Sequence, residues 1–492
     1  MTSLRKLTAL LCFFVVTNLA NAKPNVLLIV CDDLNTHVST SGYPHIKTPH
    51  LDRLAKAGVI FNRAYCQYPV CGPSRASFLS GLYPESTGVL NNKVDIRNTR
   101  PGTVSLPQFM KENGYWTGGV GKIFHTSRHE PGDLGWNEYY RFENDEFPFV
   151  AEARKQFEAE HGSVERGKTR RQWKEKLQGM FTQTRGQQQP GYGPSGLNDA
   201  QHRDGRNARK AVEWLDKKSF GDKPFFITVG IHKPHVPFIA PQKYFDLYPR
   251  QKLQFELSPK NDWDDIPRMA MVKRFGGFGF ELGRENDALR REYTQAYHAC
   301  VSFVDAQIGL ILDKLKLQKL WDDTIVIFTS DHGYHLGEHF MWGKVTLFEE
   351  CARVPLVVRV PGVSPAGATS DGLVETIDLF PTLAELCGLD APAHLQGQSY
   401  TSLIRKPDTP GRPSAYTVVS RGTQLGRSIR TKRWRYAEWG EAKAAELYNL
   451  QKDPREYTNL AKSPKHLDVV KRMESRLVER QAQAEAARKS PK

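Results

Sequence analysis

Short apolar segments alternate along most of this chain with segments of helical periodicity. This alternation favours an α/β fold in which helices flank a mainly parallel sheet, because parallel strands need long crossover connections. The expected strands are Asn25–Val30, Trp116–Val120, Phe225–Val229, Thr324–Thr329 and Pro355–Val360. The expected helices are Pro49–Ala57, Leu106–Asn113, Asp204–Lys217, Glu292–Leu320 and Thr376–Cys387.

The chain changes character after about residue 400. Short pieces rich in arginine and aromatic residues follow, which indicate a small antiparallel sheet, and a helix is expected over Leu467–Ala487. The expected strands of this sheet are Tyr416–Val419, Arg427–Arg430 and Arg433–Trp439. We therefore predict a main domain over residues 23–400 and a C-terminal subdomain over 401–492.

Two stretches interrupt the alternation. Residues 141–200 are charged and then rich in Gln, Gly and Pro, and residues 250–288 show no regular pattern. Stretches of this length between regular elements predict insertions over one face of the sheet.

The first 22 residues predict export. Arg5 and Lys6 precede an apolar run, and the segment ends in small residues at Ala20 and Ala22. This order is typical of a secretory signal peptide, with cleavage expected before Lys23. The apolar run is too short for a stable membrane anchor, so we expect a periplasmic or secreted protein.

The charge of the chain favours an anionic partner. It has 69 basic and 54 acidic side chains, which gives a formal net charge of +15. An exported protein is not expected to meet nucleic acid, so we expect an anionic extracellular polymer as the partner. A solvated basic surface without a partner is the plainer alternative.

Polar side chains follow several expected strands at the point where each strand ends. In open α/β sheets the ligand crevice lies beyond the carboxyl ends of the strands, so these side chains can converge. They are Asp32 and Asp33, Lys122 and His125, His232, and Asp331 and His332.

The acidic residues of this group suit a hard divalent cation. Three carboxylates, on Asp32, Asp33 and Asp331, together with one further ligand favour Ca²⁺ or Mg²⁺ over zinc. His335 and His339 follow nearby but do not form a His-Glu-x-x-His zinc motif. We interpret both as hydrogen-bonded histidines that support a loop.

The segment Cys71-Gly-Pro73-Ser-Arg75 is the most specific indication of a functional site in this sequence. Pro73 belongs in a first helical turn, which places Cys71 at or just before a helix N-terminus. The helix dipole and free N–H groups stabilise an anion there, and Arg75 can reach the same space. A low-pKa thiolate nucleophile and a buried structural thiol are both consistent with this placement.

This segment, followed by a helix and Gly81, resembles the signature of the type I sulfatases, which have an alkaline-phosphatase-like fold. The resemblance covers nearly the whole chain after residue 22 and is strongest to the iduronate-2-sulfatase branch. In that family a maturation enzyme oxidises the cysteine to formylglycine, whose hydrate is the nucleophile. The resemblance thus implies one Ca²⁺ ion and the ligand set Asp32, Asp33, Cys71 as formylglycine, Asp331 and His332.

The same resemblance implies roles for the other polar residues. Arg75, Lys122 and Lys344 would neutralise the sulfate oxygens. His232 or Lys344 would protonate the departing sugar oxygen, and His125 would take the proton whose removal releases sulfate from residue 71.

The function implied is that of an exported sulfatase acting on a sulfated sugar or polysaccharide, with the two insertions lining the sugar subsites. The alternatives are a phosphoester or phosphonate hydrolase of the same superfamily and a non-catalytic protein that binds polyanionic polysaccharides. The motifs do not specify the saccharide or the position of the sulfate.

Overall fold

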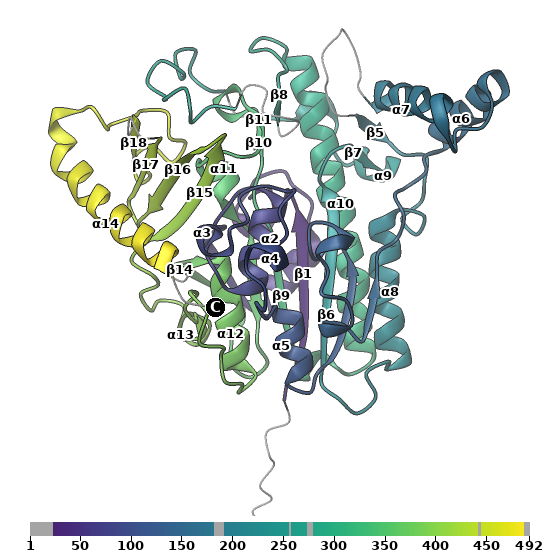
Figure 1. Cartoon of the computed structure of the whole chain (residues 1–492), viewed down its shortest axis with the longest axis horizontal. Helices are drawn as coiled ribbons and strands as arrows, with labels where there is room; N and C mark the ends of the chain where they lie inside the picture. The colour runs from purple at the N-terminus through teal and green to yellow at the C-terminus, as the bar shows by residue number, and fades with distance from the viewer. Residues whose placement is uncertain (1–22, 182–190, 255–256, 273–278, 441–443, 487–492) are drawn as a thin grey trace, which may run out of the picture.

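The computed structural model describes residues 23–181, 191–254, 257–272, 279–440 and 444–486 (Figure 1). The expected signal peptide, residues 1–22, lies outside the described residues. Within the described ranges, no helix combines the length and the apolar character needed to cross a membrane.

The largest sheet of the described residues has nine strands and contains every strand expected before residue 400. The consecutive strands β9, β1, β6, β3 and β4 run parallel, and β4 lies at the edge of the sheet. β13 and β12 pair antiparallel with their neighbours, and β14 pairs parallel with β2. These five parallel strands are β1 (Asn25–Asp32), β3 (Trp116–Gly121), β4 (Glu138–Tyr140), β6 (Phe225–Pro234) and β9 (Thr324–Ser330). The others are β2 (Val59–Tyr65), β12 (Arg353–Val354), β13 (Leu356–Arg359) and β14 (Ala368–Glu375).

Helices cover both faces of this sheet because its strands are apolar on both sides. Leu27 and Ile29 of β1 belong to one buried cluster, and Leu28 and Val30 belong to another. The first cluster includes side chains of α1 (Pro49–Ala55), α8 (Arg203–Lys217) and α10 (Asp287–Leu317). The second includes side chains of α2 (Cys71–Ser80), α5 (Leu106–Glu112) and α12 (Leu379–Leu386).

The C-terminal part forms the expected small antiparallel sheet (Figure 1). Its strands are β15 (Ala415–Arg421), β16 (Gln424–Arg430), β17 (Trp434–Trp439) and β18 (Ala444–Asn449), and α14 (Leu467–Ala486) follows. Its apolar cluster contains Tyr416 and Ile429 together with Val70 and Phe348 from the main part of the chain. The two parts therefore share a core, and the boundary at residue 400 stays a prediction.

The expected helices and strands are confirmed, with ends shifted by a few residues. The largest differences are α10, which spans Asp287–Leu317 instead of Glu292–Leu320, and β6, which continues to Pro234. The segment Thr376–Cys387 begins as a 3-10 turn, Thr376–Asp378, before α12, and Ala487 at the end of the last expected helix lies outside the described residues. The sequence analysis did not predict β2, β14 or β18. Polar residues such as Asn62 and Arg63 interrupt β2, so its segment lacks a continuous apolar run.

The first insertion is more regular than its composition indicated. It contains α6 (Pro148–His161) and α7 (Gly167–Phe181). Phe147, Val150, Phe157 and Trp173 form a separate apolar cluster with Ile239 of β7 (Phe238–Ala240). The described part of the second insertion is largely irregular, as expected, apart from short pieces such as β8 (Gly279–Phe280).

Candidate active site

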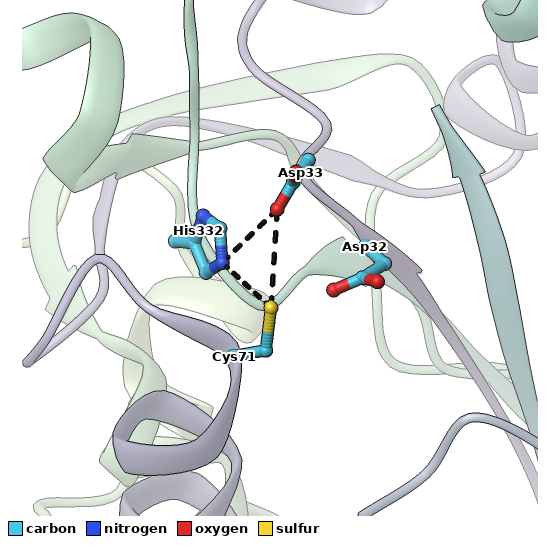
Figure 2. Close-up of side chains that lie close together, drawn as sticks. All are labelled: Asp32, Asp33, Cys71 and His332. Atoms are coloured by element: carbon cyan, nitrogen blue, oxygen red, sulfur yellow. Dashed lines mark hydrogen bonds and ion pairs between the residues drawn. The ribbon is translucent and has the colours of Figure 1, made fainter. Parts of the chain in front are cut away.

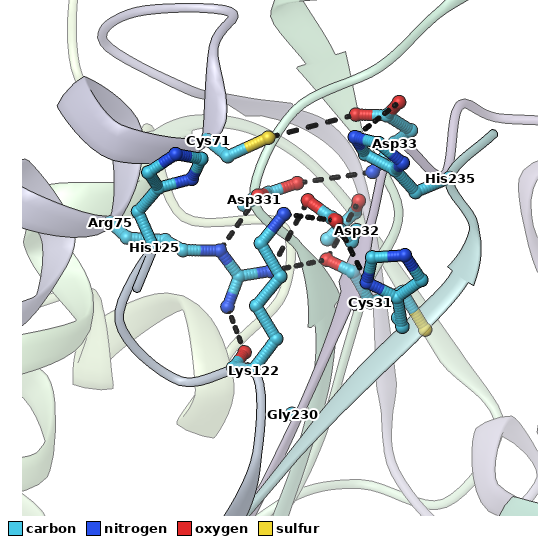
Figure 3. A network of polar contacts seen from close by, with 12 residues as sticks. Cys31, Asp32, Asp33, Cys71, Arg75, Lys122, His125, Gly230, His235 and Asp331 are labelled. Atoms are coloured by element: carbon cyan, nitrogen blue, oxygen red, sulfur yellow. Dashed lines mark hydrogen bonds and ion pairs between the residues drawn. The ribbon is translucent and has the colours of Figure 1, made fainter. Parts of the chain in front are cut away.

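The polar side chains at the strand ends meet at one edge of the sheet, as expected. Asp32 is the last residue of β1, Lys122 follows β3, His232 lies near the end of β6, and Asp331 follows β9. These four strands are neighbours in the order β9-β1-β6-β3 and run parallel, so their carboxyl ends coincide (Figure 3). The crevice predicted from the sequence therefore lies beyond this edge.

Four of the expected metal ligands form a buried cluster (Figure 2). Ligand atoms of Asp32, Asp33, Cys71 and His332 all lie within 4.8 Å of one another. His332 Nε2 is 3.2 Å from Asp33 Oδ1 and 3.4 Å from Cys71 Sγ. Asp33 has a φ of 65°, a left-handed conformation that non-glycine residues seldom adopt and that is found at functional sites.

Asp331, the fifth expected ligand, already has hydrogen bonds to both of its carboxylate oxygens. Its Oδ1 accepts from the backbone N–H groups of Asp33 (3.2 Å) and His332 (2.9 Å). Its Oδ2 accepts from Arg75 Nε at 2.8 Å. Asp331 thus holds the backbone of two expected ligands in place and borders the cluster, with Oδ1 at 3.7 Å from His332 Nε2.

The donor set fits a divalent cation. Asp32 Oδ1 and Asp33 Oδ2 are buried, and neither accepts a hydrogen bond from any described residue. Burial raises the pKa of Asp331 to about 7 against the opposing effect of Arg75 and His332. Burial acts to lower the pKa of His332, but Asp331, Cys71 and Asp33 outweigh it and raise this pKa to about 9. Crowded carboxylates with unpartnered oxygens are the environment expected for a Ca²⁺ ligand set.

Cys71 is the first residue of α2, as its sequence context predicted. Burial and Asp32 act to raise the pKa of its thiol, but Lys122, Lys344 and His332 outweigh them and hold it well below the usual value. Lys344 Nζ lies 3.5 Å from Sγ and 2.6 Å from Asp33 Oδ1, and Lys122 forms an ion pair with Asp32. Residue 71 therefore faces a positively charged pocket at a helix N-terminus.

Arg75 lies beneath the cluster and is fully buried. Besides Asp331, its guanidinium contacts the backbone oxygens of Lys122, Ile123 (3.0 Å) and Cys31 (3.3 Å), and its Nη2 lies 3.6 Å from Asp32 Oδ1. The resemblance to the sulfatases implies that Arg75 neutralises the sulfate oxygens. The geometry instead favours a positioning role, because these contacts already engage every nitrogen of the guanidinium.

Three histidines border the pocket. His232 Nδ1 is 3.7 Å from Asp32 Oδ2, and burial together with Arg203, His235 and Lys122 lowers its pKa well below the usual value. His235 Nε2 is 3.9 Å from Asp33 Oδ2. His125 also lies in this region (Figure 3), and its buried Nδ1 has no hydrogen-bond partner among the described residues.

Two residues of this region, His235 and Asp204, were given no role from the sequence, although His235 stands among the polar groups at the strand ends. His235 follows His232 by three positions in the same strand-end segment, and this spacing was the available signal. Asp204, in the first turn of α8, accepts hydrogen bonds from the backbone N–H groups of His232 and Lys233, each at 2.8 Å. No local pattern distinguishes Asp204 from an ordinary first-turn acid of a helix.

His335 and His339 lie outside this ligand cluster, and His339 belongs to a separate group with Glu350 and Glu456 that could hold a metal ion. Their interpretation as supporting residues stays a prediction. His335 Nε2 contacts Thr346 Oγ1 at 2.7 Å, and His339 Nδ1 contacts Asp262 Oδ2 at 3.0 Å. Both rings therefore have a hydrogen-bond partner, as expected, while the second ring nitrogen of each has none among the described residues.

Comparisons with known proteins identify the family to which this chain belongs. Residues 24–389 match the sulfatase family, and residues 337–483 match the C-terminal region of N-sulphoglucosamine sulphohydrolase. The chain belongs to the sulfatase family, and its fold is the alkaline-phosphatase-like fold of that family. It is accordingly a sulfuric ester hydrolase.

Two relatives and one solved structure illustrate the range of similar proteins. A sulfatase of Formosa agariphila is 32% identical over 89% of this chain and 83% of its own length. The iduronate 2-sulfatase of Mus musculus is 30% identical over 91% of this chain and 93% of its own length. A phosphonate monoester hydrolase of Agrobacterium radiobacter shares the fold, with a TM-score of 0.73, 24% identity and coverage of 94% and 96% of the two chains.

Proposed function

We propose that this protein is an exported sulfatase that hydrolyses sulfate esters of a sulfated sugar or polysaccharide. The similarity to an iduronate 2-sulfatase over 91% of the chain supports a saccharide substrate. The observation that carries the proposal is the position of Cys71 at the head of α2, with Lys344 Nζ at 3.5 Å and His332 Nε2 at 3.4 Å from its sulfur.

Cys71 is the proposed site of formylglycine, formed by a maturation enzyme that oxidises the side chain and removes its sulfur. The hydrated aldehyde of formylglycine supplies a nucleophilic hydroxyl together with a second hydroxyl through which sulfate can later be expelled. The segment Cys71, Pro73 and Arg75 supports this assignment because it matches the recognition core of the family.

A Ca²⁺ ion is proposed for the cluster of Asp32, Asp33, residue 71 and His332, with Asp331 at its border. A cation there would lower the pKa of a hydroxyl on residue 71 and offset the charge of the sulfate group. Asp32 Oδ1 and Asp33 Oδ2, which accept no hydrogen bond from a described residue, support this assignment.

The remaining residues have two proposed roles, which are binding of the sulfate charge and transfer of protons. Lys122 and Lys344 flank residue 71 and are proposed to bind the sulfate oxygens. His232, which is 22% exposed, is proposed to donate a proton to the leaving oxygen after a bound anionic ester has raised its lowered pKa, with Lys344 as the alternative donor. His125 is proposed to remove a proton at residue 71 in the step that releases sulfate.

A phosphonate or phosphate ester hydrolase is the second candidate, because the fold is shared with a phosphonate monoester hydrolase. Assays with matched sulfate, phosphate and phosphonate esters separate the two candidates. Faster turnover of the phosphonate or phosphate ester than of the sulfate ester would contradict the proposed function.

The decisive test is a screen of sulfate release from defined sulfated oligosaccharides, combined with peptide mass spectrometry at residue 71. We expect active protein to carry the aldehyde or its hydrate and one Ca²⁺ per chain, and Cys71→Ala to abolish turnover. Cys387→Ala, which removes another buried thiol, is the control and should remain active. Fully active protein with only free thiol at Cys71, or with stoichiometric zinc on which activity depends, would contradict the assignment.

A further inference from the structure

A cavity of 740 Å³ adjoins the active site. It lies between the helical hairpin α6–α7 of the first insertion and the segment that ends β6. Its size is in the range of sites that enclose small organic ligands. The described residues of the second insertion do not line this cavity.

His232 connects the cavity with the reacting centre. It lines the cavity, and its Nδ1 is 3.7 Å from Asp32 in the metal cluster. Asp204 also lines the cavity and fixes the backbone of His232 through a hydrogen bond of 2.8 Å. A sulfate ester positioned at residue 71 would therefore have its alcohol portion beside His232 and next to this cavity.

The hairpin side of the cavity is largely apolar. Phe147, Val150 and Trp173 are nearly buried, and Leu177 is half-buried beside them. Aromatic and aliphatic walls of this kind suit the carbon-bound hydrogens on the face of a sugar ring, while a few polar groups fix its orientation.

Arg203 is the polar group that stands out. It is half-buried, lines the cavity, and donates to the neutral Asn144 side chain at 2.5 Å. No carboxylate of the described residues forms an ion pair with it. Asp145, which also lines the cavity, pairs with His202 at 3.0 Å and with Arg206 at 3.3 Å.

Other arginines of this region have partners. Arg154 of α6, which also lines the cavity, lies 3.4 Å from Glu158 and 2.9 Å from Glu165. The Arg203 guanidinium is exposed where it contacts Asn144, and Asp204 attracts its charge without forming an ion pair with it. Its planar fork of N–H groups matches a carboxylate or a sulfate, so a bound anionic group would complete the site.

We propose that this cavity binds a sugar ring of the substrate and that Arg203 binds an acidic group on it, either a carboxylate or a second sulfate. This inference rests on the proposed function, since it concerns the saccharide whose sulfate ester is cleaved. It assigns saccharide specificity to the α6–α7 hairpin and to the first residue of α8, and leaves S–O cleavage to the cluster around residue 71.

The test compares kcat/KM for sulfate release from three related oligosaccharides. The first carries a uronate carboxylate next to the cleaved sulfate, the second is its carboxyl-reduced form, and the third is the reduced form with a second sulfate. We expect the wild type to prefer one or both acidic substrates over the reduced one. Arg203→Gln should lower kcat/KM for the preferred acidic substrate about 10- to 100-fold, mainly through KM, as for a lost charged hydrogen bond.

Arg203→Gln should lower kcat/KM for the reduced substrate much less. Trp173→Ala should lower kcat/KM for all three substrates. Arg170→Gln removes the same charge from an exposed position of α7 and should change none of them. Calorimetric titration of the desulfated acidic product should show the same loss of affinity in Arg203→Gln, and thermal unfolding checks that this variant is folded.

The outcomes distinguish a failure of this inference from a failure of the proposed sulfatase function. A preference for the carboxylate or for the second sulfate identifies which acidic group Arg203 binds. Equal kcat/KM for acidic and reduced substrates, in the wild type and in Arg203→Gln alike, overturns this inference and leaves the sulfatase activity standing. Absence of sulfate release from every substrate by formylglycine-containing wild type would overturn the proposed function and this inference with it.

Discussion

At the scale of single residues, the active site depends on buried charges that hold one another in place. Arg75 connects the carboxylate of Asp331 to backbone oxygens at the ends of β1 and β3, and Asp331 in turn orients Asp33 and His332. Such a residue affects catalysis through geometry, and its removal leaves a buried carboxylate without its partner.

Arg75→Lys should therefore lower both stability and activity, although it keeps the positive charge. A lysine cannot donate in several directions within one plane, so Asp331 and the backbone oxygens would lose most of their donors. We expect the free energy of unfolding to fall by about 3 kcal/mol and kcat to fall at least 100-fold. Urea denaturation and sulfate-release kinetics measure both quantities. Arg97→Lys at an exposed ion pair is the control, and wild-type stability of Arg75→Lys would refute the positioning role.

Asp305 should make stability depend on pH. Burial raises its pKa to about 7 against the hydrogen bonds from the N–H groups of Leu51 and His50, with a further rise from Asp52 and a reduction from Arg53. The folded state thus binds a proton that the unfolded state has released above about pH 4. The contribution of Asp305 to stability is full below that pH and is lost as pH rises towards 7.

Asp305→Asn removes this titration. The difference in the free energy of unfolding, variant minus wild type, should rise by roughly 1–3 kcal/mol from pH 5 to pH 8. The missing hydrogen-bond acceptor can lower the stability of the variant by an amount that does not depend on pH. Denaturation at several pH values measures this slope. Asp313→Asn, on the exposed side of the same helix, makes the same substitution, keeps Asp305 and serves as the matched control. A difference between Asp305→Asn and the wild type that does not vary with pH would be inconsistent with the buried acid.

At the scale of elements, the ends of β3 and β6 leave no room for a side chain at the paired positions Gly121 and Gly230 beside the active site. Gly121 has a φ of +83°, and Gly230 faces it across the strand pair. A Cβ atom on Gly230 would lie 2.2 Å from the backbone of Lys122. The two glycines therefore allow the strand ends to bring Lys122 and His232 to the same pocket.

Gly230→Ala should push the end of β3 away from β6 and displace Lys122. We expect a loss of about 1–3 kcal/mol in the free energy of unfolding, as in other overpacked sites, and a larger loss of kcat than this destabilisation explains. Thr228→Val on the same strand is the control, because it removes a hydroxyl that has no hydrogen-bond partner among the described residues. Full activity of Gly230→Ala would show that the close approach is not needed to place Lys122.

At the scale of the whole molecule, α14 is joined to the main sheet through a buried ionic network. Arg480 of α14 lies 2.7 Å from Glu375, the last residue of β14, and Arg412 lies 2.8 Å from the same carboxyl group. Tyr83 donates to Glu375 at 2.5 Å. The C-terminal end of the chain therefore contributes to the stability of the sheet that carries the active site.

Arg480→Met should lower the unfolding midpoint without changing the pocket. We expect a loss of about 1–3 kcal/mol, less than for a fully broken buried pair, because Arg412 and Tyr83 still contact Glu375. Thermal unfolding gives the midpoint, and sulfate release below the transition gives the activity, which should stay near the wild-type value. Arg476→Met on the exposed face of α14 should leave the midpoint unchanged. An unchanged midpoint in Arg480→Met would exclude this contribution.

Much of the fold and part of the site follow from local patterns. Apolar runs that end in Asp32 or Asp331 predict both a strand and a polar crevice, because strand formation and the position of its end depend on neighbouring residues. Pro73 likewise predicts the start of α2 and hence the setting of Cys71. These properties depend on residues close in the chain.

Other features depend on contacts between distant segments. Strand β2 forms inside the sheet because β13 and β14 pair with it, although its own segment is partly polar. The burial of Arg75 and the support of His232 by Asp204 join residues separated by 256 and 28 positions. Local sequence determined the strand ends and the chemistry that they carry. Only the tertiary structure decided which side chains meet, because the free energy of burial and pairing arises between segments that local periodicity does not relate.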